Sequence, residues 1–414
     1  MQAYKKKGFW VGLLLFIVCN VLPPPPGLSE SGWVVASVTM LMAAWWATEA
    51  VPVAVTALLP LTLFPLLGVT DIKTAGLPYA NPNIYLFMGG FILALGIEAS
   101  GLHKRLALKM LLLVGNSGAR LVGGFMLVSA LISMWVMNTS TTLMLLPIGL
   151  AVCASVSQTI PDMSSKDRKS FEVALLLGIA YAATIGGMST LVGTAPNIIF
   201  AGFMKETYDI EISFIDWMRL AVPLSFIMLI ASWYALTSIV YPVNFQATEK
   251  TKIKLKSMLD ELGALSKDEK KVLLIFGFAA LAWMFRKLIN LIPGFELLTD
   301  AGVALIAALL FFIIPSSMHK NDLLTWDQAN KLPWGLLVLF GGGLSLAAQI
   351  GSSGLGEWIG DGLTVLQSVP PIVLVLCVAT LIIFLTEITS NVATTSTFYK
   401  ACCGNAWKKK KCRR

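Results

Sequence analysis

The chain consists mostly of long apolar runs separated by short polar segments. Roughly ten of these runs approach the ~20 apolar residues that a helix needs to cross the hydrocarbon core of a bilayer. The uninterrupted runs lie at residues 8–22, 33–48, 52–67, 84–97, 220–240, 272–292 and 301–314. This pattern predicts an all-α polytopic membrane protein.

Two further apolar runs are interrupted near their middles. Residues 121–156 contain a polar island at residues 137–142, and residues 171–203 contain Gly193 and Pro196 at an interior position. Glycine weakens a helix, and proline lacks the backbone N–H that a helix interior uses. A polar, non-helical middle is typical of a re-entrant hairpin, which we expect over residues 121–156. Residues 171–203 are predicted to form a broken helix with an unwound middle.

A second polar island, at residues 390–395, repeats the first. Asn391 lies 253 positions after Asn138, and the same offset carries Ser133 onto Thr386. It also relates two pairs of apolar and glycine-rich segments, 87–91 with 340–344 and 100–102 with 353–355. Agreement along one gap-free offset indicates an internal repeat. Two equivalent islands suggest that they contribute to one shared site.

The charged residues predict that the two copies have opposite orientations. Residues 102–121 carry four basic residues and no acid, which suits a helix at the cytoplasmic membrane interface. The corresponding residues 356–370 contain Glu357 and Asp361 and neither lysine nor arginine. By the positive-inside rule, the first copy faces the cytoplasm and the second faces outward. The prediction is therefore an inverted-topology repeat transporter, with a cytoplasmic N-terminus following from Lys5, Lys6 and Lys7.

Composition supports a membrane protein and argues against other classes. The chain is 56% hydrophobic and 13% charged, too few charges to cover a soluble domain of 414 residues. Seven of the 31 lysines and arginines follow Phe398 and none of the 23 acids does, so the body is nearly neutral and suggests no nucleic-acid partner. The cysteines and His103 and His319 show no metal-binding spacing, and no nucleophile–base pair or phosphate loop indicates an enzyme.

The interrupted segments lack cationic side chains. Residues 121–162, 172–204 and 332–399 contain no lysine or arginine. An anion bound there would depend on helix N-termini, amides, hydroxyls and co-bound cations such as Na+. The alternative is that the island side chains only cross-link helices, as polar residues often do in membranes. For three isolated acids, Glu49, Glu98 and Glu387, a functional role and a structural role in helix contacts are equally supported.

Several motifs together resemble the divalent anion/sodium symporter family of di- and tricarboxylate and sulfate carriers. They are Trp45-Trp46-Ala47-Thr48-Glu49-Ala50-Val51-Pro52, Leu86-Phe87-Met88-Gly89-Gly90-Phe91, Gly101-Leu102-His103-Lys104-Arg105, Gly186-Gly187-Met188 with Gly193-Thr194-Ala195-Pro196-Asn197, and Thr386-Glu387-Ile388-Thr389-Ser390-Asn391. The likeness extends from about residue 10 to Phe398. It implies sodium-coupled secondary active symport of a divalent anion, such as succinate or sulfate, by an elevator-type mechanism. It also implies a homodimer in the cell membrane, most simply a bacterial inner membrane.

The resemblance also implies site residues. Na+ ligands would be Ser133, Asn138, Gly193 and Asn197 at a first site and Thr386, Thr389 and Asn391 at a second. Substrate contacts would come from Asn138, Thr139, Thr194, Pro196, Ser390 and Asn391. Met137 and Val392 depart from the family pattern, each removing one hydroxyl.

The repeat offset predicts that the second copy is incomplete. It places the partners of Thr194 and Asn197 beyond Arg414, and the residues after Phe398 are too basic for a membrane segment. We therefore expect a chain truncated at its C-terminus. Two alternatives to symport remain at this point: a non-transporting remnant of such a carrier and an anion exchanger on the same fold.

The expected organisation has six parts. They are N-terminal spanning helices of the scaffold at residues 1–83, repeat 1 at 84–241, a cytoplasmic loop at 242–271, spanning helices and a loop at 272–332, an incomplete repeat 2 at 333–398 and an aberrant basic tail at 399–414.

Overall fold

The structure is a computed structural model that describes residues 3–113, 117–160, 163–245, 249–317, 322–362 and 370–386. Within these residues the regular elements are helices, and isolated bridge residues such as the pair Pro315 and Asp322 form no strand. The described chain divides into two compact units, each assembled from segments that are distant in sequence. Unit 1 draws on Met1–Ile84, Ile198–Ile212 and Pro333–Arg414, and unit 2 on Tyr85–Asn197 and Ser213–Leu332.

Unit 1 is built around α2 and α17. Its helices are α1 (Ala3–Val21), α2 (Glu30–Thr48), α3 (Val53–Thr56), α4 (Leu59–Leu66), α5 (Ile72–Gly76), the 3₁₀ turn η1 (Leu77–Ala80), the part of α11 (Ala195–Tyr208) from Ile198 onward, α17 (Trp334–Ser352), α18 (Leu355–Gly362) and α19 (Pro371–Thr386). The apolar side chains of Met42, Phe64 and Leu339 are buried together in its core. Burial of this apolar surface, at ~25 cal/mol per Å², holds α2, α4 and α17 together.

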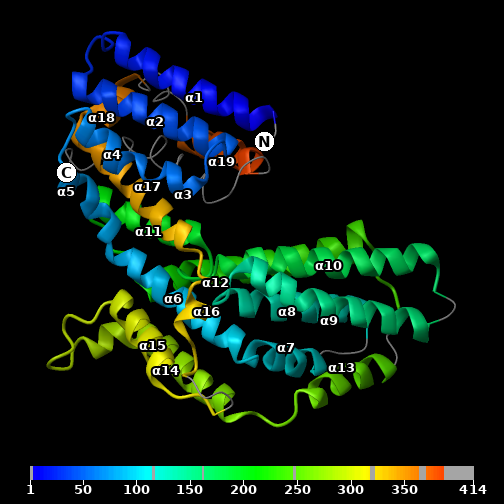
Figure 1. Cartoon of the computed structure of the whole chain (residues 1–414). Coiled ribbons are helices and arrows are strands. Elements are labelled where there is room, and N and C mark those ends of the chain that lie inside the picture. The colour runs from blue at the N-terminus through cyan, green and yellow to red at the C-terminus, as the bar shows by residue number, and fades with distance from the viewer. Residues whose placement is uncertain are drawn as a thin grey trace. The chain divides into compact units, whose positions relative to one another are not determined.

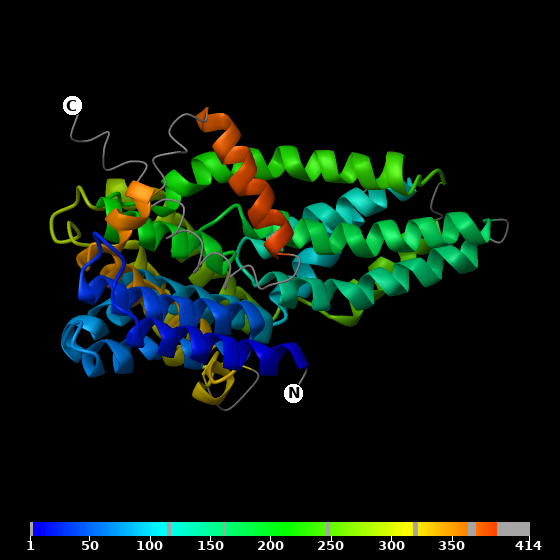
Figure 2. The same ribbon diagram turned by 90° about the horizontal axis from the view of Figure 1, so that it is seen from above.

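Unit 2 contains the two interrupted segments. Its helices are α6 (Pro82–Ala99), α7 (Leu102–Leu112), α8 (Gly118–Ser133), α9 (Asn138–Thr159), α10 (Ser165–Gly187), the start of α11 (Ala195–Tyr208), α12 (Phe214–Tyr234), the π-helical turn η2 (Ala235–Val240), α13 (Glu249–Glu261), α14 (Lys267–Ile289), α15 (Asp300–Ile313) and α16 (Trp326–Ala329). The helices α8, α9 and α10 run side by side, as both ribbon views show (Figures 1 and 2). This three-helix group positions the turn before α9 next to the end of α10.

Six helices of the described residues are long and apolar enough to cross a membrane. They are Pro82–Ala99, Asn138–Gln158, Ser165–Gly187, Phe214–Val240, Lys267–Ile289 and Trp334–Ser352. Four shorter apolar helical segments accompany them, at Val53–Leu66 (α3 and α4 together), Gly118–Ser133, Asp300–Ile313 and Val375–Phe384. α1 and α2 were also expected to span the membrane but are not in this set. Three lysines near the start of α1 lower its hydropathy.

The element bounds follow the offset found in the sequence. α8 and α19 begin 253 positions apart, at Gly118 and Pro371. α6 and α17 likewise end at Ala99 and Ser352. A glycine with positive φ, 74° at Gly101 and 78° at Gly354, follows each of these helices, in the left-handed region that glycine adopts without strain. The two copies therefore share local backbone structure as well as residues.

Two expected segments contain local structure that the sequence did not indicate. The single helix expected at residues 52–67 is interrupted at Ala57 and Leu58. Pro60 lies in the first turn of α4, where its missing N–H is not needed, so it favours the start of a new helix. The polar segment at residues 242–271, expected as a loop, contains the helix α13, whose lysines, glutamates and leucines are good helix formers.

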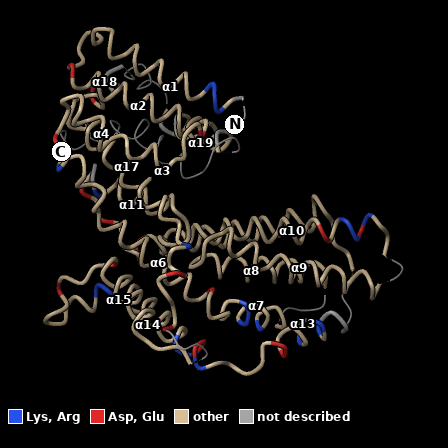
Figure 3. The backbone as a smooth tube through the Cα atoms, in the orientation of Figure 1, with Lys and Arg blue, Asp and Glu red and all other residues tan. Residues whose placement is uncertain are grey.

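The basic segment at residues 102–121 also differs from its prediction. The helix there is α7, which ends at Leu112, and not all of its basic side chains face outward. Arg105 is buried, and its Nε lies 2.7 Å from Oε1 of the equally buried Glu269. Lys and Arg positions gather where α7 lies beside α13 (Figure 3). One of the residues that suggested a membrane-surface helix therefore ties this helix to α14.

Candidate functional site

The first candidate segment is the turn between α8 and α9. α8 ends at Ser133 and α9 begins at Asn138, which leaves residues 134–137 as the turn. The Ser133 hydroxyl is fully buried and donates to Oδ1 of Asn138 at 2.7 Å. It also lies 3.4 Å from the carbonyl oxygen of Val136. Two side chains expected to bind Na+ are thus in direct contact at this turn.

The first polar island is helical, contrary to the expectation of a non-helical middle. Asn138 to Thr142 form the first turn of α9, and the Thr142 hydroxyl donates to the carbonyl oxygen of Asn138 at 2.8 Å. A hydroxyl that bonds to its own helix backbone does not require a break in the helix. The break lies instead at residues 134–137, where the side chains of Met134, Trp135 and Val136 are apolar.

The second candidate segment is the non-helical stretch between α10 and α11, at residues 188–194. Asn197, in the first turn of α11, is buried, and its side-chain amide points back across this break. Nδ2 donates to the carbonyl oxygens of Gly187 at 3.0 Å and Thr190 at 2.7 Å, and it lies 3.4 Å from that of Met188. One buried amide therefore holds the break closed.

The turn and the break meet in unit 2. A Cβ atom on Gly187 would lie 2.4 Å from Oδ1 of Asn138, which places the Asn138 amide against the end of α10. The buried Thr190 hydroxyl donates to the carbonyl oxygen of Met134 in the turn and accepts from the backbone N–H of Gly193 at 3.1 Å. We call Ser133, Asn138, Gly193 and Asn197, together with Thr190, the oxygen cage.

Thr190 and Trp217 were not among the residues expected from the sequence. Thr190 lies in the interrupted segment, and its polar side chain within an apolar run could have identified it as a candidate site residue. Trp217, on α12, donates from Nε1 to the carbonyl oxygen of Met188 at 2.9 Å. Nothing in its local sequence indicates this contact, because its partner is 29 positions away.

The remaining residues expected in the first half lie at the same helix starts. Thr139 is exposed in the first turn of α9, and Thr194 and Pro196 are half-buried at the start of α11. Glu98 contacts the island, because the Ser140 hydroxyl donates to its Oε2 at 2.8 Å. Glu49 instead forms an exposed ion pair with Lys5 at 3.3 Å, which fits the structural alternative.

The second polar island lies outside the described residues, and of the residues expected at the second site only Thr386 is described. Thr386 is the last described residue of α19, and its hydroxyl donates to the carbonyl oxygen of Ile383 at 2.8 Å. Glu387, Thr389, Ser390 and Asn391 lie beyond the described part of the chain. The second Na+ site and the second set of substrate contacts therefore remain predictions.

The geometry of the cage suits an alkali cation beside an anion. Hydroxyl, amide and carbonyl oxygens are neutral, hard ligands of the kind that bind Na+ in interrupted helices. α9 and α11 begin here, and helix N-termini carry partial positive charge that favours an anion. Among the described residues, no group of three or more His, Cys, Asp or Glu is placed to hold a metal ion.

Removing the Thr190 hydroxyl should weaken Na+ binding. In Thr190→Val the carbonyl of Met134 and the N–H of Gly193 lose their shared partner. Unpaired buried groups cost ~1–3 kcal/mol, so we expect the half-saturating Na+ concentration to rise about tenfold. Thr190→Ser keeps the hydroxyl and should stay within about twofold. Thermal stabilisation titrated with Na+ measures both, and equal values for the two variants would contradict the role.

Comparison with known proteins places the chain among membrane carriers. A family model described as the sodium:sulfate symporter transmembrane region matches residues 6–405. The sodium-dependent dicarboxylate transporter SdcS of Staphylococcus saprophyticus is 39% identical over 396 residues, which are 94% of this chain and 75% of the relative. The transporter of the same name from Staphylococcus aureus strain USA300 is 37% identical over 393 residues, with the same two coverages.

Proposed function

Because the chain belongs to the sodium:sulfate symporter family, we propose that it carries a dicarboxylate across a membrane together with Na+. The family consists of transporters and not enzymes, and the chain is a multi-pass membrane protein. Na+ is then a co-substrate that moves with the anion and not a resident cofactor. The substrate class rests on the two relatives, which are named as sodium-dependent dicarboxylate transporters.

The observation that carries the proposal is the contact between the α8–α9 turn and the α10–α11 break. It brings Asn138 against Gly187 and joins the two segments through Thr190. No lysine or arginine occurs at residues 121–162 or 172–204 to neutralise a bound dianion. Co-bound Na+ at neutral oxygens would supply that charge, which accounts for a coupled mechanism.

We assign residues to the two ligands as follows. Na+ would bind first at Ser133, Asn138, Gly193 and Asn197, and a second ion at Thr386, Thr389 and Asn391. The dicarboxylate would contact Asn138, Thr139, Thr194, Pro196, Ser390 and Asn391. In the first half this is supported by Asn138 and Asn197, at the starts of α9 and α11, which both lie against Gly187.

The membrane arrangement is part of the same proposal. We propose an inverted-topology repeat with re-entrant hairpins and broken helices, a cytoplasmic N-terminus, and a homodimer working by an elevator-type movement in a bacterial inner membrane. Support comes from the equivalent starts of α8 and α19 and from the opposite charge of the segments that follow α6 and α17. These two observations fit copies that face opposite sides of a bilayer.

Uptake into liposomes tests the proposed function. The purified chain is reconstituted, and entry of labelled succinate is measured with external Na+ and again with choline replacing Na+. We expect uptake that depends on Na+ and is lost in Asn138→Ala, because the amide oxygen that contacts Ser133 is removed. Equal uptake in the two media would favour an anion exchanger, and no uptake in either medium would contradict dicarboxylate transport.

A further inference from the structure

A stack of aromatic rings in unit 2 holds Trp135, which lies in the middle of the α8–α9 turn. Its ring is nearly parallel to those of Phe214 and Trp283, with centroids 5.8 Å and 6.1 Å away. Phe276 meets it edge-on at 4.9 Å. Phe214 and Trp283 are themselves stacked at 4.6 Å and are almost completely buried. The turn is thus fixed by rings from α12 and α14, not only by contacts within the hairpin.

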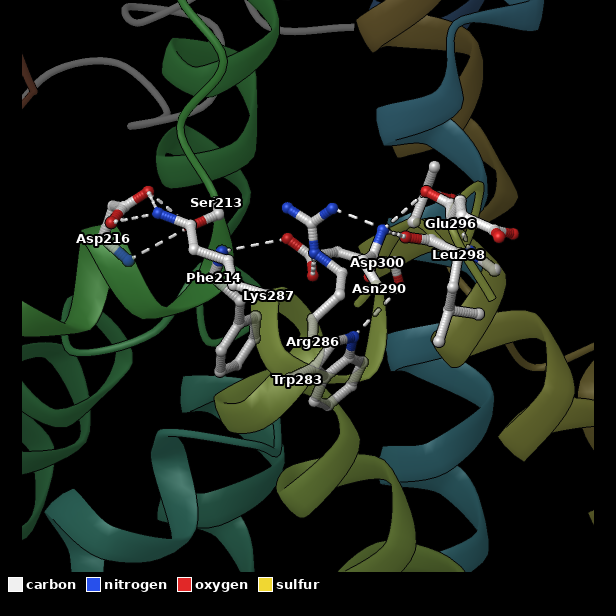
Figure 4. Close-up of polar contacts among 12 residues, drawn as sticks. Ser213, Phe214, Asp216, Trp283, Arg286, Lys287, Asn290, Glu296, Leu298 and Asp300 are labelled. Atoms are coloured by element: carbon white, nitrogen blue, oxygen red, sulfur yellow. Dashed lines mark hydrogen bonds and ion pairs between the residues drawn. The ribbon is translucent and has the colours of Figure 1, made fainter. Parts of the chain in front are cut away.

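Asp300, at the start of α15, fixes the rings that receive Trp135. Its Oδ2 accepts the backbone N–H of Phe214 at 2.9 Å, and its backbone oxygen accepts Nε1 of Trp283 at 3.0 Å. Oδ1 lies 2.7 Å from Nε of Arg286 in a largely buried ion pair. Figure 4 shows these four residues converging from α12, α14 and α15. Asp300 therefore bonds to both residues of the stacked pair, to Phe214 through its carboxylate and to Trp283 through its backbone carbonyl.

The carbonyl oxygens of the residues before and after Trp135 contact side chains of the oxygen cage. The carbonyl oxygen of Met134 accepts the Thr190 hydroxyl, and that of Val136 lies 3.4 Å from the Ser133 hydroxyl. The position of the Trp135 ring fixes the backbone from which both carbonyls project. A shift of the ring would rotate these peptide groups and move Ser133 and Asn138, which are hydrogen-bonded to each other.

We propose that Trp135 is a positioning residue for the Na+ site, held by the stack of Phe214, Phe276 and Trp283 that Asp300 orders. The proposal rests on the proposed function, since it requires Na+ to bind at the cage. The ring contributes no ligand atom. It keeps the turn in the one conformation that presents the Ser133 and Asn138 oxygens together.

A role of the stack in Na+ binding can be distinguished from a role in packing alone. Only the first role predicts that loss of the stack changes the Na+ affinity of a folded chain. A packing role alone predicts that Trp135→Leu lowers the unfolding temperature while the Na+ concentration for half-maximal stabilisation stays the same. The positioning role predicts that this concentration rises as well. Stabilisation by a ligand follows the ratio of its concentration to its dissociation constant, so a titration separates the two effects.

The test compares Trp135→Leu with Trp135→Phe, Asp300→Asn and the control Trp10→Leu, whose side chain is 65% exposed. We expect Trp135→Leu to raise the half-saturating Na+ concentration about tenfold, which corresponds to ~1.4 kcal/mol. Trp135→Phe keeps a ring that can stack and should remain within about threefold. Asp300→Asn should raise the value about threefold by loosening Phe214 and Arg286. Trp10→Leu should leave it unchanged.

A transport measurement provides the second readout. In Trp135→Leu the Na+ dependence of uptake should shift to higher concentration, while the KM for succinate at saturating Na+ changes less than about twofold. An unchanged half-saturating Na+ concentration in folded Trp135→Leu overturns the proposal. If that variant does not fold, Asp300→Asn decides in the same way. Absence of any Na+ effect on the unaltered chain contradicts the proposed function instead.

Discussion

Gly193→Ala should abolish Na+-dependent transport. A Cβ at position 193 would lie 2.4 Å from the carbonyl oxygen of Gly187 and 3.0 Å from that residue's Cα. These are backbone atoms, and the same carbonyl is already held by Asn197 at 3.0 Å, so neither side can yield without opening the break. Overpacking costs ~1–3 kcal/mol, and we expect the upper end, a loss of about 100-fold in Na+ affinity.

Gly277→Ala is the matched control for this prediction. Gly277 lies within α14, and a Cβ there would meet no atom within 4 Å. Alanine in a helix interior is favoured over glycine by ~1 kcal/mol, so this variant should be as stable as the parent or more so. Na+ titration and succinate uptake are compared for both variants. Normal Na+ affinity in Gly193→Ala would show that the break tolerates an added methyl group and that the cage is misassigned.

Arg105→Met should give the largest loss of stability. The guanidinium pairs with Glu269 and donates to three consecutive carbonyl oxygens, those of Leu262, Gly263 and Ala264, at 2.7 to 3.2 Å. Glu269 accepts the N–H of Ser266 at the start of α14, so it would stay buried without its cation. Breaking a buried pair by removing one partner costs ~3–5 kcal/mol. We expect the free energy of unfolding to fall by about that amount.

Arg219→Met provides the comparison for Arg105. Arg219 is 71% exposed and lies 3.4 Å from Asp216, a carboxylate that Lys287 also contacts. Exposed pairs are worth ~0–1 kcal/mol, so its removal should be nearly neutral. Denaturant unfolding of the two variants in the same detergent measures the difference. A similar small effect for both would mean that the α7–α14 connection does not stabilise the fold.

The interrupted helix was predictable because its cause is local. Gly193 and Pro196 weaken a helix wherever they occur, and the structure leaves residues 188–194 non-helical. The 253-residue offset between Asn138 and Asn391 was likewise visible without coordinates, and the starts of α8 and α19 follow it. Single-residue chemistry and repetition along the chain were therefore enough to locate half of the candidate site.

The contacts that hold the site were not predictable, because they join residues far apart in sequence. Arg105 and Glu269 are 164 positions apart, so the arginine was interpreted as one of several membrane-surface charges. Trp135 lies in an apolar run, where the presence of one more aromatic residue does not indicate which side chains it contacts. Its partners Phe214 and Trp283 come from other helices. Such pairs depend on tertiary packing, which local periodicity does not encode.

The closure of the α10–α11 break by Asn197 has an evolutionary consequence. One amide reaches the carbonyls of Gly187 and Thr190 from the next helix, so the seven residues of the break form a loop whose length is fixed by a single side chain. An inserted or deleted residue would move the amide out of reach of both acceptors. Among carriers that share this amide, the segment should vary in composition but not in length, which makes it a reliable anchor for aligning distant members.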